Sequence, residues 1–318
     1  EGPTKNTNSP SSMAALIPRM ARVPLGYSIS TSFRRIIKQS PYSLSNRFVY
    51  PIVKDREGGI WIGTFYGGVN YLSPNTGQFE CFAHSRFSNS VNGTVIGRFC
   101  EDTYGHIWIA SDDGGLSCFS PKDKHFTHYL PDEHGNSLSY HNVHALCMDG
   151  DDLWIGTYTG GVNVLNTKTG VFRIYTTKAG DPTTLDRSSS YAIFKDREAR
   201  IWVTSMSGVN LYNREEDNFT RIRDLGSWIM DIDQDADGNI WFSSQGNGLF
   251  KYDPDKQEWT NYVHSSAPGA LINDQVNCVL IDGNGEMWIG TMNGLCKYNA
   301  KEDQFELIPL DIPSRNIC

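Results

Sequence analysis

The sequence lacks several features that would assign it to a membrane, a nucleic acid or a metal. Among its 318 residues no apolar run approaches the roughly 18 to 20 that a membrane helix needs, so we expect no membrane contact from this chain. Its 28 Lys and Arg are outnumbered by 36 Asp and Glu, and the net charge of −8 argues against a nucleic-acid partner. Its 7 cysteines include no Cys-x-x-Cys pair, so neither a disulfide framework nor zinc is indicated.

What the sequence does contain is an internal repeat. Tryptophan recurs with steps of 47, 46, 48, 39 and 47 residues, each time within the text Asp-x-x-Gly-x-Ile-Trp or a close variant. The third copy is one residue shorter, and the fourth carries Ala199 where the others have glycine. The six tryptophans are Trp61, Trp108, Trp154, Trp202, Trp241 and Trp288.

Each repeat predicts four short antiparallel strands. A short apolar stretch leads into the Asp-x-x-Gly turn, the tryptophan strand follows, and a second glycine turn and a polar turn separate two more strands. Four strands in a period of about 40 to 50 residues are typical of a β-propeller blade, with the tryptophan packed between neighbouring blades. The fold class is therefore all-β, and the blades are expected at about 43–82, 90–129, 137–175, 183–222, 226–262 and 271–308.

The ends of the chain are less regular. Residues 28–38 resemble the last strand of a repeat, and residues 309–318 resemble the beginning of the next one. They could combine into a composite seventh blade, or they could belong to a longer array of repeats. Residues 1–27 match nothing and are expected to be irregular, which leaves one propeller domain over 28–318.

The repeat text resembles a known family. Ser-Leu-Ser, Asp-x-x-Gly-x-Ile-Trp-Ile-Gly-Thr or its shorter variant, and Gly-Gly-Val, as found in Ser43 to Leu72 and Ser137 to Leu165, are similar to the two-component regulator propeller repeat. Such repeats form the periplasmic sensor region of hybrid two-component histidine kinases in Bacteroides-like bacteria. The resemblance implies a periplasmic, non-catalytic sensor that binds a glycan-derived oligosaccharide. It also implies pairing into a homodimer, and a membrane helix and kinase elsewhere in the full-length protein.

One face of the propeller is expected to carry the ligand. The links from an outer strand to the next inner strand and the tips after Trp-Ile-Gly-Thr open on the same side, because strands alternate in direction. Aromatic, amide and carboxylate side chains gather there, and these groups suit the faces and hydroxyls of a sugar. Ordinary solvated loops are the alternative for any single residue. The candidates are Arg47, Phe65, Tyr66, Asp112, Asp113, His141, Tyr158, Thr159, Trp228, Gln245, Asp274 and Asn293.

Catalysis is not expected, and neither is a metal or cofactor. The repeat aspartates occur once per blade, so each is interpreted as a turn cap that accepts backbone N–H groups, and they do not provide the close carboxylate pair of a glycosidase. Asp112 and Asp113 are interpreted as solvated charges. His141 and His144 are three residues apart on a strand and should point to opposite faces.

Two alternatives to a glycan sensor stay open. One is a scaffold propeller that binds a protein partner. The other is an enzyme similar to the streptogramin lyases, with His141 as the one histidine expected at the channel mouth.

Overall fold

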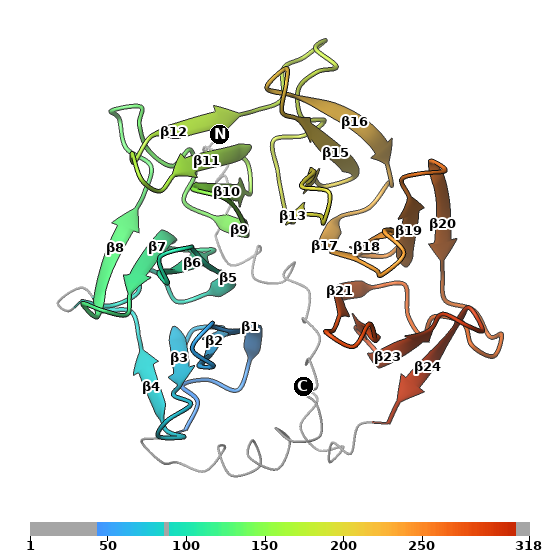
Figure 1. The fold of residues 1–318 in the computed structure, drawn as a ribbon, viewed down its shortest axis with the longest axis horizontal. Helices are drawn as coiled ribbons and strands as arrows, with labels where there is room; N and C mark the ends of the chain where they lie inside the picture. Colours follow the sequence, from blue (N-terminus) through green and yellow to red (C-terminus); the bar gives the residue numbers. More distant parts are fainter. Residues whose placement is uncertain (1–42, 86–88, 310–318) are drawn as a thin grey trace, which may run out of the picture.

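The computed structural model describes residues 43–85 and 89–309, and it contains six sheets of four antiparallel strands, each in chain order. Figure 1 shows the six sheets as blades around a common centre, with the first strand of each innermost. The all-β propeller and its six blades are confirmed. The segments expected to form a seventh blade are 28–38 and 309–318, and all of them except residue 309 lie outside the described residues, as does the irregular segment 1–27.

The strands of the first three blades are β1 (Val49–Lys54), β2 (Ile60–Thr64), β3 (Val69–Leu72), β4 (Phe79–Phe82), β5 (Ile96–Glu101), β6 (Ile107–Ser111), β7 (Gly115–Ser120), β8 (His125–Tyr129), β9 (Val143–Asp149), β10 (Asp152–Thr157), β11 (Val162–Asn166) and β12 (Phe172–Tyr175). Those of the last three are β13 (Ile193–Lys195), β14 (Ile201–Thr204), β15 (Gly208–Asn213), β16 (Asn218–Asp224), β17 (Ile229–Gln234), β18 (Ile240–Ser244), β19 (Leu249–Asp253), β20 (Glu258–Tyr262), β21 (Val276–Ile281), β22 (Met287–Thr291), β23 (Gly294–Asn299) and β24 (Gln304–Ile308).

The repeat aspartate fixes the turn between the first two strands of a blade. In the first blade one carboxylate oxygen of Asp55 accepts the backbone N–H of Gly59 at 2.6 Å, as expected for a turn cap. The other oxygen accepts the indole N–H of Trp61 at 2.9 Å, which the sequence interpretation did not anticipate. The same pair of bonds recurs in the second, fourth, fifth and sixth blades. The aspartate therefore ties the turn to the core tryptophan.

The third blade departs from this pattern, and here the turn-cap interpretation is wrong. Its turn is one residue shorter, and the carboxylate of Asp149 instead binds Lys195 at 2.8 Å and Arg214 at 2.6 Å in the fourth blade. The buried indole nitrogen of Trp154 consequently has no hydrogen-bond partner among the described residues. In this blade an ion pair between blades therefore replaces the hydrogen bond between the repeat aspartate and the tryptophan.

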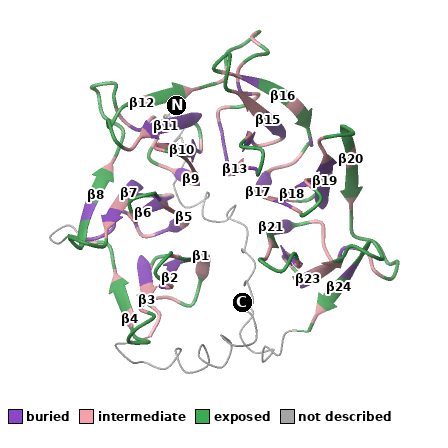
Figure 2. Cartoon of the chain, viewed as in Figure 1, coloured by how far each residue is buried: buried purple, intermediate pink, exposed green. Residues whose placement is uncertain are grey.

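The core lies between the blades. Trp202 of the fourth blade packs on Phe242 and Tyr252 of the fifth, with ring centroids 6.1 and 5.9 Å apart. Figure 2 shows that the buried residues are concentrated on the inner strands, while the outer strand of each blade is largely exposed. Trp288 belongs to the last described blade and is only half-buried, whereas Trp241 is fully buried against Tyr298 of the next blade. Radial stacking of the tryptophan-centred units is confirmed.

Two further features bear on the chemistry. The six cysteines among the described residues are free thiols. Within that same part of the chain, no helix has the length and apolar character required to cross a membrane.

Candidate functional site at the channel mouth

The two kinds of loop expected on one face do lie together. At five of the six described tips, a backbone N–H following the second strand donates to a carbonyl in the link that leads into an inner strand. Examples are Phe65 to Phe48 at 2.9 Å and Gln245 to Trp228 at 2.9 Å. These bonds hold the tips beside the beginnings of the inner strands, so their side chains border the mouth of the central channel.

A series of contacting side chains, a carboxylate followed by three rings, crosses this mouth from the second blade to the fifth. Nδ1 of His144 lies 3.4 Å from a carboxylate oxygen of Asp112. The imidazole stacks on Tyr191 with centroids 4.7 Å apart, and Tyr191 stacks on Trp228 at 5.3 Å. Tyr158 meets His144 edge-on at 6.0 Å. Contacts thus link side chains from four blades, with Tyr191 buried among them.

The first blade adds a second aromatic group. Tyr50 stacks on Phe65 at 5.6 Å, and Phe65 contacts Tyr66 at 4.2 Å. Tyr66 is 63% exposed and has a φ of 66°, a left-handed conformation that costs a residue with a side chain about 1 kcal/mol or more. The fifth blade has Gly246 at the corresponding tip position. A strained, exposed aromatic ring at a channel mouth favours a binding role.

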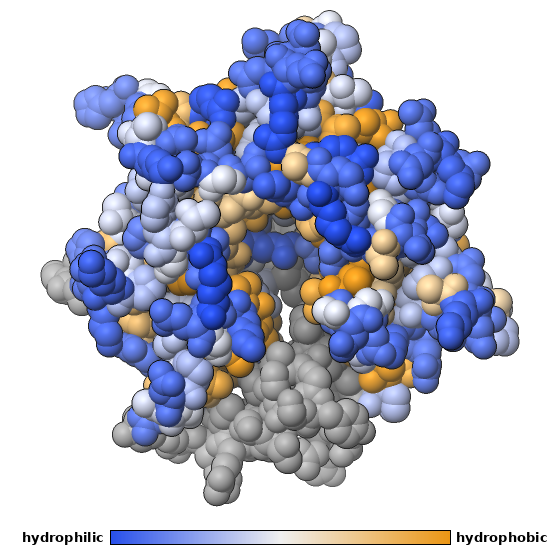
Figure 3. Space-filling view, viewed as in Figure 1, coloured by the Kyte–Doolittle hydropathy of each residue, from blue (hydrophilic) through white to orange (hydrophobic). Residues whose placement is uncertain are grey.

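Below the rings, an ion pair crosses the channel. The guanidinium of Arg98 on β5 donates to the carboxylate of Asp231 on β17 at 2.8 Å and to the carbonyl of Met230 at 3.1 Å. It therefore joins the second and fifth blades. Figure 3 shows a face of the ring hollowed at its centre, with apolar and hydrophilic atoms side by side around the hollow. The Arg98–Asp231 pair gives the channel a polar floor.

Burial shifts the pKa values of two side chains at the mouth, Asp112 and His144. Burial, together with the charge of Asp113, raises the pKa of Asp112 to about 7. Burial, together with the charge of Arg98, lowers the pKa of His144 to about 4. Burial therefore disfavours the charged forms of both side chains.

Several buried polar atoms near the mouth have no protein partner within the described residues. They are Nε2 of His144, both side-chain polar atoms of Asn277 and Nε2 of Gln245. Buried polar groups are nearly always hydrogen-bonded, and leaving one unpaired costs about 1–3 kcal/mol. Water or a hydroxylated ligand would satisfy them.

The structure brings together some of the residues predicted from the sequence. The aromatic group of the first blade contains Phe65 and Tyr66. The series around His144 contains Tyr158, Trp228 and the carboxylate of Asp112. The side-chain amide nitrogen of Gln245 is one of the unpaired atoms.

Other predicted residues serve the loops themselves. Arg47 lies over the Phe48 ring at 4.9 Å, and Asp274 accepts the backbone N–H of His264 at 2.6 Å. His141 stacks beside Tyr140, and the exposed Thr159 and Asn293 are at tips.

The interpretation of Asp112 and Asp113 as solvated charges is wrong. Asp113 accepts bonds from the Thr94 hydroxyl at 2.6 Å and the Ser111 hydroxyl at 2.7 Å, so it caps its loop. The side chain of Asp112 is only 28% exposed and contacts His144. The expectation that His141 is the one histidine at the mouth is corrected as well, because His144 lies there.

Sequence reasoning missed Tyr50, His144, Tyr191, Asn277 and Arg98. The first four all occupy the position five residues before a repeat aspartate, whereas the ring chosen from the sequence was eight residues before it. Counting at five residues would have found them. Among the described residues no three His, Cys, Asp or Glu side chains are grouped as metal ligands would be.

Comparison with known proteins places the repeats in a family context. The repeat of the two component regulator propeller family matches residues 43–66, 137–159 and 270–293. A histidine kinase P4 of Formosa agariphila is 25% identical over 187 residues, which are 54% of this chain and 13% of that protein. The chain therefore spans only a small part of that relative.

Solved structures share the fold. The extracellular domain of a hybrid two component system of B. thetaiotaomicron superimposes with a TM-score of 0.52 at 23% identity, over 78% of this chain and 39% of that one. Virginiamycin B lyase from Staphylococcus aureus gives 0.64 at 14% identity, over 84% and 86%. PorZ, a surface component of the type-IX secretion system of Porphyromonas gingivalis, gives 0.59 at 16%, over 78% and 38%. At these identities the similarities establish the propeller fold.

Proposed function

This chain carries two-component regulator propeller repeats, and from that premise we propose that it is a ligand-sensing propeller of a two-component signalling system. Its ligand is a glycan-derived oligosaccharide bound at the channel mouth. The chain itself is not catalytic, and it acts in the periplasm. Ligand binding changes its state, and that change is transmitted to other segments of a longer protein.

The observation that carries the proposal is the composition of the mouth. The exposed ring of Tyr66 and the partly exposed ring of Trp228 offer flat apolar surfaces for the C–H faces of a sugar. The unpaired atoms of His144 and Asn277 offer both donors and an acceptor to its hydroxyls. Beneath these groups Arg98 and Asp231 form an ion pair across the channel, so their two charges offset each other. An uncharged, polyhydroxylated ligand matches these three properties together.

The direct test is a calorimetric titration of the chain with a panel of oligosaccharides. We expect one class to bind, and we expect Trp228→Ala and Tyr66→Ala to weaken binding about five- to thirtyfold, since each removes a contact surface worth about 1–2 kcal/mol. Tyr104→Ala is the matched control, because Tyr104 is 55% exposed near the Asp-x-x-Gly turn at the other rim. Binding that tolerates both mouth substitutions, or a panel with no ligand, would refute the proposal.

Pairing of two sensor subunits is a separate part of the proposal. Receptors of this kind commonly signal through paired subunits, so we expect the oligosaccharide to shift the chain from monomer to dimer. Sedimentation of the chain with and without the bound sugar measures this directly. An unchanged monomer at saturation would remove dimerisation from the account while leaving ligand binding intact.

A lyase activity is the second candidate, and one observation favours it. Nδ1 of His144 lies 3.4 Å from Asp112, and its buried Nε2 has no partner among the described residues, an arrangement that suits a proton-transfer group. The low pKa of His144, caused by its burial, makes it a weak base and counts against this activity. Magnesium-dependent turnover of a streptogramin that is lost in His144→Ala would establish the enzyme, and its absence would leave the sensor.

A further inference from the structure

A second site is indicated at the opposite rim, where the second blade lacks the long side chain that the first, fourth, fifth and sixth blades place against their tryptophan. The third blade has the short Val164 across from Trp154, but there Tyr212 of the next blade contacts the indole ring at 4.6 Å. In each blade the residue directly across the sheet from the repeat tryptophan is on the third strand. In the fifth blade this partner of Trp241 is Lys251, and its ammonium lies 5.6 Å from the centroid of the indole ring. In the sixth blade the partner of Trp288 is Lys297, whose ammonium lies at 5.5 Å.

Two more blades cover their tryptophan with a long side chain. In the fourth blade the guanidinium of Arg200 lies 5.6 Å from the Trp202 ring. In the first blade the ring of Tyr71 lies 4.6 Å from that of Trp61. Three of the six tryptophans therefore bind a cation of the chain itself, at the distance at which a cation is attracted by an aromatic face.

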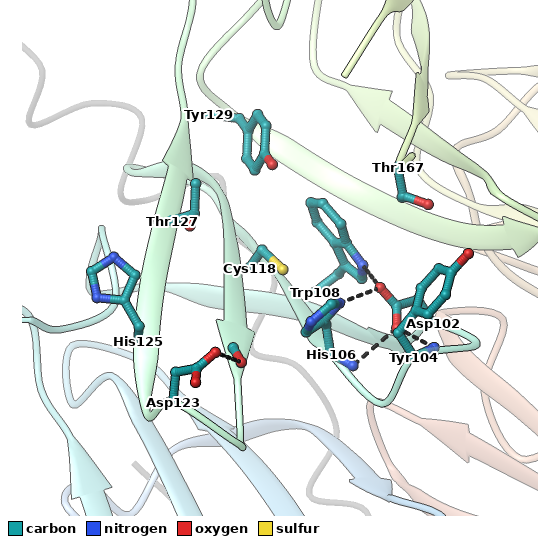
Figure 4. A pocket seen from close by; sticks show the side chains of 11 residues that line it. Asp102, Tyr104, His106, Trp108, Cys118, Asp123, His125, Thr127, Tyr129 and Thr167 are labelled. Carbon is teal, nitrogen blue, oxygen red and sulfur yellow. Dashed lines mark hydrogen bonds and ion pairs between the residues drawn. The ribbon is translucent and has the colours of Figure 1, made fainter. Parts of the chain in front are cut away.

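In the second blade the residue across from Trp108 is Cys118, whose side chain is too short to reach over the ring. A cavity of about 390 Å³ remains in its place. Figure 4 shows its walls: Cys118 and Thr127 lie on one side, Tyr129 lies above the indole of Trp108, and Thr167 of the third blade lies on the other side. We call it the Trp108 cavity. Its volume is within the range of small-ligand sites.

The cavity also has the charge that a cation requires. Two of the three internal cations have a carboxylate neighbour, as Lys297 has Glu286 at 2.5 Å and Arg200 has Asp196 at 2.5 Å. Asp102 and Asp123 line the Trp108 cavity, where Nδ1 of His106 lies 2.9 Å from the Asp102 carboxylate and the Ser120 hydroxyl donates to Asp123 at 3.1 Å. The nearby Lys168 does not supply the missing charge, since its ammonium binds Asp151 at 2.8 Å on the rim.

We propose that the Trp108 cavity binds an organic cation, with an ammonium head over Trp108 where Lys251 places its own ammonium over Trp241. The attraction comes from the face of the indole ring and from the two carboxylates. The site lies at the Asp-x-x-Gly turns, at the other end of the strands from the mouth, so it is independent of the oligosaccharide. The head could belong to a small quaternary ammonium compound or to a lysine side chain of a partner.

The experiment follows the indole N–H signal of Trp108 by NMR in protein labelled with ¹⁵N at tryptophan. Choline represents the free compound, and lysine blocked at both backbone ends represents the partner's side chain. The uncharged carbon isostere of choline tests the charge. We expect a saturable shift with at least one of the two cations, at millimolar concentrations, and binding of the isostere that is roughly tenfold weaker.

Reciprocal variants test the location. Cys118→Lys should fill the cavity with a tethered ammonium and abolish binding, while Cys118→Ser should preserve it. Lys251→Cys should create a second site at Trp241, visible as a new shift of that indole signal. Equal binding of choline and its isostere, undiminished binding to Cys118→Lys, or no shift with either cation would overturn the proposal. None of these results depends on whether the mouth binds a sugar.

Discussion

Replacing Asp112 by Asn tests the electrostatics of the mouth without any ligand. The carboxyl is half-buried beside His144, and burial together with the charge of Asp113 raises its pKa from 3.8 to about 7. Because the folded chain holds this proton more tightly than the unfolded chain does, the contribution to stability is full below about pH 4. It is lost as the pH rises to about 7 and is constant above that.

The size of the effect follows from the shift. About three pKa units at roughly 1.4 kcal/mol each give an upper bound of about 4 kcal/mol for the cost of ionising Asp112 in the folded chain. Solvent reaches 28% of the side chain, so the observed cost should be about half of that bound. Asparagine has nearly the same shape and carries no charge, so Asp112→Asn should recover this free energy above about pH 7 and gain nothing below about pH 4.

Urea unfolding of both proteins at about pH 4 and about pH 8 measures the difference. Asp255→Asn, at an exposed turn, is the control for the loss of one negative charge. We expect Asp112→Asn to be more stable by on the order of 2 kcal/mol at the higher pH alone. A gain of equal size at both pH values, or a variant less stable than the parent at pH 8, would refute the reasoning.

Three further predictions concern other parts of the fold. Ala199 holds a φ of 61° where the other turns have glycine, so Ala199→Gly should raise the free energy of unfolding by about 1 kcal/mol in urea titrations. Tyr66→Gly should relieve the same strain and raise the melting temperature by about 2 °C in calorimetry, yet weaken oligosaccharide binding. Arg98→Met should leave Asp231 unpaired and lower stability by about 1–3 kcal/mol at neutral pH, with recovery in the double variant that also carries Asp231→Leu.

The blades could be predicted from the sequence because their determinants are local. The aspartate, glycine and tryptophan of each repeat act within ten residues of one another, so the turn at Asp55 and the packing of Trp61 follow from the text alone. The shortened third repeat could not be predicted in this way. Moving Asp149 by one residue breaks its bond to Trp154, and its new partners Lys195 and Arg214 come from a different blade.

The mouth was predicted only in part, for a related reason. The pairing of each inner strand shifts register near its beginning in five of the six described blades, as it does between Ile96 and Arg98. Such a bulge breaks the alternation of side chains on which a strand interpretation depends. The tips at Tyr66 and Tyr158 lie outside the strands and were found, whereas His144 lies at the beginning of a strand and was not.

The account's central claim is that the oligosaccharide binds at the channel mouth, and the indole N–H signals of the tryptophans test it most directly. In a titration with the sugar selected from the panel, the signal of Trp228 should shift and saturate with the calorimetric affinity, while that of Trp108 stays in place. A saturable shift confined to Trp108, or calorimetric binding that leaves Trp228 unmoved, would contradict the account.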